Sequence, residues 1–137
     1  MGFEVFLESF GSTARLGIPR AAVRALFPIV EEESEPDYWR VRYDDRNSCH
    51  ISVKPVTLDN EKLKSLCVER PCGDMRLWKS LLTVLRMGSI FIFWPGGPLV
   101  LANDSKAAEL PEDLIEGMGR PIVADSAEAL LRLVQES

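Results

Sequence analysis

Three cysteines and the single histidine are the first residues to consider for metal chemistry in this 137-residue chain. Cys49 and His50 are adjacent, whereas Cys67 and Cys72 are separated by four residues, which is not the spacing of a zinc knuckle or a redox pair. A four-ligand zinc site could use all three cysteines together with His50. The odd number of cysteines and the absence of a secretory context favour reduced thiols. We therefore expect isolated or buried thiols and no metal site.

A cysteine–histidine pair for nucleophilic catalysis is a second interpretation of these residues. Cys49 and His50 fall in the alternating segment CHISVKPV, residues 49–56, which is typical of a strand. Neighbouring residues of a strand point to opposite faces of the sheet, so this pair is not expected to act together. No recognisable serine or cysteine nucleophile motif accompanies His50. We expect a structural or surface histidine and no catalytic residue.

The segment IFIFWPGGPLVLAND, from Ile90 to Asp104, is the strongest candidate for binding a phosphate. A P-loop requires a lysine and a hydroxyl after its last glycine, followed by the start of a helix. Here Gly97 is followed by Pro98 and Leu99, and Pro98 lacks the backbone N–H that a phosphate would need. The segment therefore predicts a buried strand and a tight turn into a second strand. We expect no cofactor, and a ligand pocket near residues 94–98 stays as the alternative.

Carboxylates are concentrated in two parts of the chain. Residues 31–45 hold seven acids and two arginines, and residues 104–136 hold eight acids and three bases, so each part has a net charge of −5. Adjacent acids such as Asp44 and Asp45, with Asp59 and Glu61 beyond them, are more typical of solvated turns than of metal sites. The acidic segment is either a solvated loop or a face that steers a basic partner into contact.

The second interpretation predicts a partner-binding surface around residues 31–45. The carboxylates would attract a basic protein surface, and the aromatic residues beside them would anchor it. The overall net charge of −5 argues against a nucleic acid or an anionic membrane as partner, because both require a basic face. The predicted partner-binding residues are Glu31, Glu32, Glu33, Glu35, Asp37, Tyr38, Asp44 and Asp45.

The elements that must position these residues follow from hydrophobic periodicity. The alternation in residues 38–44 and 49–56 predicts a hairpin, and residues 31–37 are predicted to be a polar loop. The other predicted strands are residues 3–10, 65–71, 90–94, 99–102 and 120–125. The predicted helices begin near Pro19, after Asp74, near Ser105 and after Ser126, with a short helical turn over residues 59–63. Apolar residues at helical spacing indicate the first, second and last of these helices: Ala22, Ala25, Leu26, Ile29 and Val30, then Met75, Trp78, Leu81, Leu82 and Leu85, then Ala127, Leu130, Leu131 and Val134. Pro28 is expected to end or kink the first helix, and the polar third helix is expected over roughly residues 105–117.

Length and composition predict one domain. A chain of 137 residues can bury well over half of its unfolded surface, and its apolar and charged fractions of 46% and 27% are those of an ordinary globular protein. We predict a single α+β domain over residues 1–137, with a mixed central sheet of about four to seven strands and helices packed on it. The first ten residues lack the basic region of a signal peptide, and residues 81–94 are too short to span a bilayer, so we expect a cytoplasmic protein.

One long segment resembles a known family. CVERPCGDMRLWKSLLTVLRMGSIFIFWPGGPLVLAND, residues 67–104, contains the pattern V-x-R-P-x-x-D-x-R-L-W, then a leucine-rich helix, then an apolar strand that ends in Pro-Gly. LPEDLIEGMGRPIVADSAEALL, residues 110–131, fits the same pattern. Together they resemble bacterial immunity proteins, small cytoplasmic inhibitors that are encoded beside polymorphic secreted toxins. The resemblance covers about half of the chain, and its motifs are core and turn features.

The resemblance implies a protein without catalytic activity that binds its cognate toxin and blocks it. Interfaces of immunity proteins diversify with their toxins, so the family supplies no shared binding residues for this chain. The partner that we expect is a toxin with a basic surface. The alternative is a small-molecule-binding domain or a small enzyme with a pocket near the turn at residues 94–98.

Overall fold

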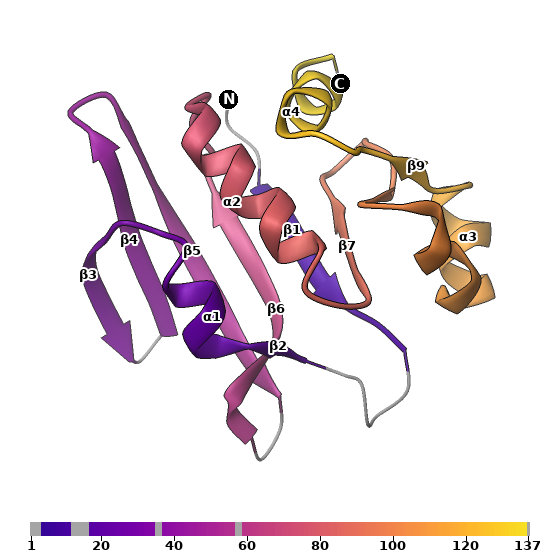
Figure 1. The fold of residues 1–137 in the computed structure, drawn as a ribbon, viewed down its shortest axis with the longest axis horizontal. Helices are drawn as coiled ribbons and strands as arrows, with labels where there is room; N and C mark the ends of the chain where they lie inside the picture. The colour runs from indigo at the N-terminus through magenta and orange to yellow at the C-terminus, as the bar shows by residue number, and fades with distance from the viewer. Residues whose placement is uncertain (1–3, 12–16, 35–36, 57–58, 137) are drawn as a thin grey trace.

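The structure is a computed structural model that describes residues 4–11, 17–34, 37–56 and 59–136 (Figure 1). One mixed sheet of nine strands is packed with short helices in a single α+β domain, which confirms the predicted class. The strands are β1 (Glu4–Ser9), β2 (Ile18–Pro19), β3 (Ile29–Ser34), β4 (Asp37–Asp44), β5 (Asn47–Val56), β6 (Asp59–Glu69), β7 (Ile90–Phe93), β8 (Val100–Leu101) and β9 (Ile122–Val123). The helices are α1 (Arg20–Arg24), α2 (Met75–Leu85), the 3₁₀ helix η2 (Asp104–Glu109), α3 (Glu112–Met118) and α4 (Ala127–Gln135).

The strands follow the order β3-β4-β5-β6-β1-β7-β8-β9, and β2 pairs with β6 beside this path. All pairs are antiparallel except β8 with β9. The predicted hairpin is present as β4 and β5, where Trp39 and Val41 are buried and Arg40 and Arg42 are exposed. A clean alternation of this kind means that one side of these strands meets the core and the other faces solvent.

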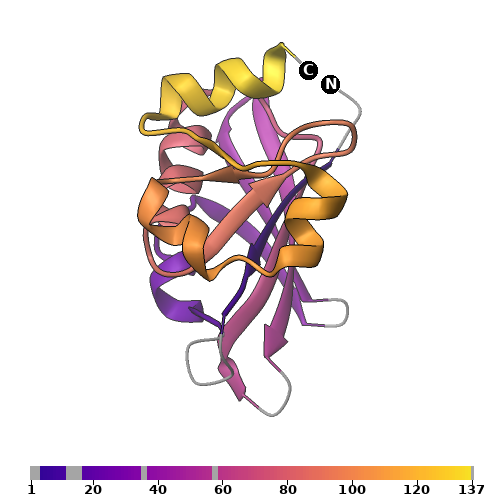
Figure 2. The ribbon, with the colours of Figure 1, turned by 90° about the vertical axis from the view of Figure 1, so that its right-hand side faces the viewer.

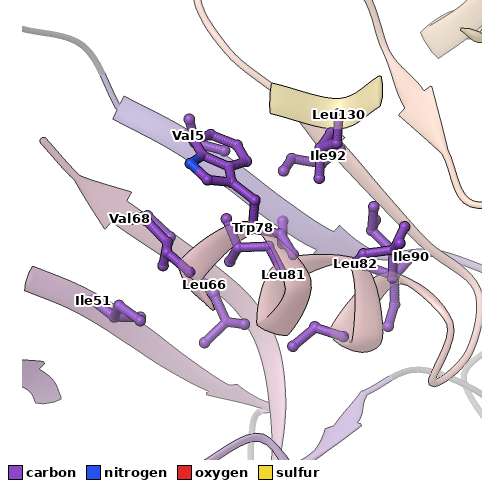
Figure 3. Packing of buried hydrophobic residues seen from close by; sticks show 14 of the residues in the cluster. Val5, Ile51, Leu66, Val68, Trp78, Leu81, Leu82, Ile90, Ile92 and Leu130 are labelled. Carbon is purple, nitrogen blue, oxygen red and sulfur yellow. The ribbon is translucent and has the colours of Figure 1, made fainter. Parts of the chain in front are cut away.

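Helix α2 forms most of the layer on the core side of the sheet. Its N-cap is Asp74, as predicted, whose side chain accepts a hydrogen bond from the backbone N–H of Arg76. Trp78, Leu81 and Leu82 point from α2 toward the sheet, as Figure 3 shows, among side chains of β1, β5, β6 and β7. Helix α4 lies beside α2, and its Leu130 enters the same core. The predicted apolar stripe of α4 is therefore buried.

Strand β7 is covered on both sides, as its continuous apolar sequence predicted. Ile90 and Ile92 belong to the core beneath α2, whereas Phe91 belongs to a second, smaller core. That second core is closed by Leu110 and by side chains of η2 and α3. The helices α3 and α2 thus lie on opposite sides of the sheet at this end of the molecule (Figures 1 and 2).

Several predicted elements were wrong, and pairing in the sheet explains most of them. Residues 31–34 form part of β3 rather than a loop, because the chain after Pro28 pairs with β4 and gains ladder hydrogen bonds. Residues 59–63 are the start of β6 rather than a helical turn, since they pair with β5 and β2. The helix expected over residues 105–117 is divided into η2 and α3 by Pro111, which cannot continue a helix.

The two strands that periodicity missed, β2 and β3, account for the difference between the expected four to seven strands and the observed nine. Both lie next to the short helix α1, where the spacing of Ala22, Ala25, Ile29 and Val30 predicts a longer helix that Pro28 ends or kinks. That helix ends at Arg24, and Ile29 pairs with Val41 instead.

Candidate functional site

None of the described helices packs on the side of strands β3, β4, β5, β6 and β1 that points away from α1 and α2 (Figures 1 and 2). We call this surface the open face. The second core, under η2 and α3, lies on β7 and β8 instead. The described side chains of the open face are all exposed or half-buried. They are Glu4, Phe6, Glu8, Glu31, Glu33, Tyr38, Arg40, Arg42, Ser48, His50, Ser52, Lys54, Ser65, Cys67 and Glu69.

The centre of the open face is hollowed around His50 and Glu69, which are cross-strand partners on β5 and β6. One hollow of about 400 Å³ is lined by Ser48, Cys49, His50, Glu69 and Arg70. An adjoining hollow of about 300 Å³ is lined by Tyr38, His50, Ser52 and Glu69. His50 and Glu69 border both hollows, so these two side chains mark the middle of the surface.

The polar groups at this centre are arranged by contacts across the strands. The rings of Tyr38 and His50 form a T-shaped contact, with 5.8 Å between the ring centroids and 77° between the ring planes. Ser52 donates a hydrogen bond from its Oγ to Glu69 Oε1 over 3.1 Å. Arg70, which follows β6, has a φ of 51°, the left-handed region that residues other than glycine rarely adopt. The side chains of Tyr38, His50, Ser52 and Glu69 that border the hollows thus come from three paired strands, β4, β5 and β6.

The thiol of Cys67 lies on the same face and is a poor nucleophile. It donates a hydrogen bond from Sγ to Glu4 Oε2 over 3.0 Å. Burial raises the pKa of Cys67 to about 12, and the carboxylates of Glu4 and Glu69 act in the same direction. Because a thiolate is the reactive form, this environment does not suit cysteine catalysis.

The eight predicted partner-binding residues do not form one surface. Glu31, Glu33 and Tyr38 lie on the open face, where a hydrogen bond to Glu33 raises the pKa of Tyr38. Glu32 and Asp37 turn toward α1, since they contact Arg24 and Arg20. Asp44 and Asp45 lie at the β4–β5 turn. Glu35 lies outside the described residues.

Arginines pair with most of these carboxylates. The ion pairs are Arg20–Asp37 (2.7 Å between nitrogen and oxygen), Arg24–Glu32 (2.9 Å), Arg40–Glu31 (3.5 Å), Arg76–Asp44 (3.1 Å) and Arg42–Asp45. The hydrogen bonds from Arg24 hold the pKa of Glu32 below its ordinary value. Three of the arginines lie outside residues 31–45, so the local net charge of −5 overstates the free negative charge of this surface.

The possible zinc ligands are separated by the pleat of the sheet. Cys49 points into the core beneath α2, whereas its neighbour His50 and the more distant Cys67 lie on the open face. Among the residues that the structure describes, no group of three or more histidine, cysteine or acidic side chains could hold a metal ion. Asp44, one of the acids considered for a metal site, accepts hydrogen bonds from the backbone N–H groups of Arg46 and Asn47 and so shapes the turn.

The glycine-rich segment connects β7 to the antiparallel β8, as expected for a tight turn between strands. The backbone N–H of Gly97 donates to the carbonyl of Trp94 over 2.9 Å, and Gly96 has a φ of 80°, which glycine adopts readily. The buried indole of Trp94 lies directly against Gly97. The indole therefore packs against this turn from the core.

The pairing of His50 with Glu69 could not be predicted from the sequence, because the two residues come from different strands. Only the register between β5 and β6 brings these positions together. The available signal was the alternation of residues 49–56, which predicts that His50, Ser52 and Lys54 share one solvent-facing side. The matching alternation in β6 is interrupted between Leu63 and Leu66, which are three residues apart and are both buried.

Comparison of the chain with family models, with curated proteins and with solved structures gives no match. The described helices include none that is long and apolar enough to cross a membrane. The open face and the family resemblance of residues 67–104 and 110–131 are therefore the two observations that bear on function.

Proposed function

We propose that this protein is a non-catalytic immunity protein that binds a cognate secreted bacterial toxin in the cytoplasm and neutralises it. The observation that carries the proposal is the open face, an uncovered side of five neighbouring strands with half-exposed aromatic side chains. Phe6 and Tyr38 lie on this face with His50, and aromatic residues of this kind often anchor protein interfaces. The family resemblance supports the same conclusion.

The size of the open face suits a protein partner. Five strands spaced about 4.8 Å apart span about 24 Å, and strands of six to eleven residues are roughly 20–36 Å long. The resulting area is on the order of 600 Å² before side chains are considered, and a standard interface buries about 800 Å² of accessible surface on each partner. A sheet is also rigid, so little conformational entropy is lost on binding.

Charged residues around Phe6, Tyr38 and His50 would form a rim that fixes the orientation of the partner. Glu31 and Arg40 form an exposed ion pair at the β3 side of the face, and Lys54 lies on β5. Rim charges affect the association rate and its salt dependence more than the final affinity. Of the acids in residues 31–45, the described members of this rim are Glu31 and Glu33.

Co-expression with the product of the adjacent gene tests the function. We expect that product alone to stop growth of a host strain and the wild-type protein to restore growth. The control is the same strain carrying the toxin gene and an empty vector. Either a product that does not stop growth, or one that remains toxic in the presence of the wild-type protein, would contradict the proposal.

A small-molecule site is the second candidate, and the hollow around His50 is the observation that favours it. Its volume of about 400 Å³ lies within the range of ligand pockets, roughly 300–1,000 Å³. Mass spectrometry of the native protein would detect a retained small molecule. A mass equal to that of the chain alone after gentle purification, together with growth rescue, would leave the binding of a protein as the better account.

A further inference from the structure

We propose that the open face receives a lysine or arginine side chain of the partner between Glu4 and Glu69. This inference rests on the proposed function and names the chemistry that the partner presents to the centre of the surface. Glu4 and Glu69 are directly opposed across β1 and β6, and both side chains reach the open face. The site therefore offers two carboxylates to one cation.

The arrangement of these two carboxylates is unfavourable in the isolated protein. Like charges that are directly opposite on neighbouring strands destabilise a sheet. Among the described residues, the side-chain hydrogen-bond donors to this pair are neutral: the Ser52 hydroxyl for Glu69 and the Cys67 thiol for Glu4. No described cation forms an ion pair with either carboxylate.

Other described acids of strands β1, β3 and β4 either contact an arginine or face a neutral residue across the strands. Glu31, on the same face, contacts Arg40, and Asp37 contacts Arg20 near α1. Glu33 and Glu8 have no arginine partner in the described structure, but across the strands they face the neutral residues Tyr38 and Ser65. Glu4 and Glu69 are the opposed acids of the open face, which singles out this position for a cation supplied from outside.

The surroundings of the two carboxylates suit the apolar stem of a lysine or arginine as well as its charged end. Glu69 borders both hollows, so a side chain that enters beside His50 meets the Glu69 carboxylate. Glu4 lines neither hollow and lies next to Glu69 on the neighbouring strand β1. The half-exposed rings of Phe6 and Tyr38 lie on the same face and offer apolar contact to the methylene stem. A cation bound there would form charge-assisted hydrogen bonds and remove the repulsion between the two carboxylates.

Reversing the charge of Glu69 separates this role from a structural one. Glu69→Lys places a cation opposite Glu4, so the melting temperature of the protein alone should rise by about 3 °C. The same change should raise the Kd for the purified product of the adjacent gene at least tenfold, because the site now repels a cation. Binding and stability would move in opposite directions, whereas a merely structural glutamate would weaken both.

Two further variants complete the experiment. Glu69→Gln keeps the size of the side chain and should raise the Kd about fivefold and reduce its dependence on salt. Glu116→Lys changes the net charge equally on the exposed side of α3 and should leave the Kd within about twofold of wild type.

The outcomes distinguish the inference from the proposed function. If wild type binds and protects cells but Glu69→Gln and Glu69→Lys bind equally well, the inference is wrong and the proposed function stands. It is equally wrong if Glu69→Lys lowers the melting temperature and Glu69→Gln keeps the wild-type Kd. If the wild-type protein neither binds the product nor protects cells, both are overturned.

Discussion

Gly97 is the position where one added methyl group should disturb the core most directly. A Cβ atom built there would lie 2.0 Å from Nε1, 2.4 Å from Cε2 and 2.5 Å from Cδ1 of Trp94. Trp94 has only 2% of its surface exposed, so the indole has no free space into which it can move. The Gly97→Ala substitution must therefore displace the turn or repack the buried ring.

The expected loss can be given a magnitude. Forcing extra atoms into a packed core costs about 1–3 kcal/mol. Unfolding a chain of this length changes entropy by about 0.3 kcal/mol/K, so the melting temperature should fall by about 3–10 °C. Circular dichroism and urea unfolding followed by tryptophan fluorescence would measure the change by two independent signals.

Gly88→Ala is the matched control for this substitution. Gly88 also lies in a turn, but a Cβ atom there meets nothing within 4 Å and the backbone is outside the left-handed region. Its stability should remain within about 0.5 kcal/mol of wild type. If Gly97→Ala melts at the same temperature as Gly88→Ala, the indole does not lie against the turn as described, and the reasoning is refuted.

Other predictions concern acid stability and thiol reactivity. Hydrogen bonds from Arg76 lower the pKa of Asp74 to about 2, below its unfolded value, so this contribution to stability is present above about pH 4 and is lost as the pH falls toward 2. Asp74→Asn, which keeps a capping oxygen, should lose less stability over that range in urea titrations; an equal loss would contradict this assignment. Burial raises the pKa of both Cys49 and Cys67 to about 12, so iodoacetamide at pH 8 should modify them far more slowly in the native protein than in urea. Equal rates by mass spectrometry would show that these thiols are not protected.

Elements that are indicated by patterns among neighbouring residues were predicted correctly. The spacing of Trp78, Leu81, Leu82 and Leu85 indicated α2, and the continuous apolar run of β7 indicated a strand covered on both sides. These signals are local, because one helix face or one strand repeats within a few residues. The α+β class followed from the mixture of such segments.

Segments that become extended only by pairing with another strand were predicted poorly. The glutamates of β3 have low strand propensity, and only pairing with β4 makes this segment extended. Charged side chains on an edge strand also discourage pairing with other chains, which gives Glu31–Glu33 a structural role beside any role in binding. The net charge of residues 31–45 follows from the sequence, but the positions of Arg20, Arg24 and Arg76 beside these acids do not.

The central claim is that the open face binds the partner, and calorimetry on two matched double variants tests it most directly. Tyr38→Ala with His50→Ala removes two side chains from the centre of the face, whereas Lys79→Ala with Glu128→Ala removes two exposed side chains from α2 and α4. We expect the first pair to raise the Kd for the product of the adjacent gene at least tenfold and the second to change it less than about twofold. Unchanged affinity for the open-face pair, with a loss for the helix pair, would place the interface on the other side of the sheet and contradict the account.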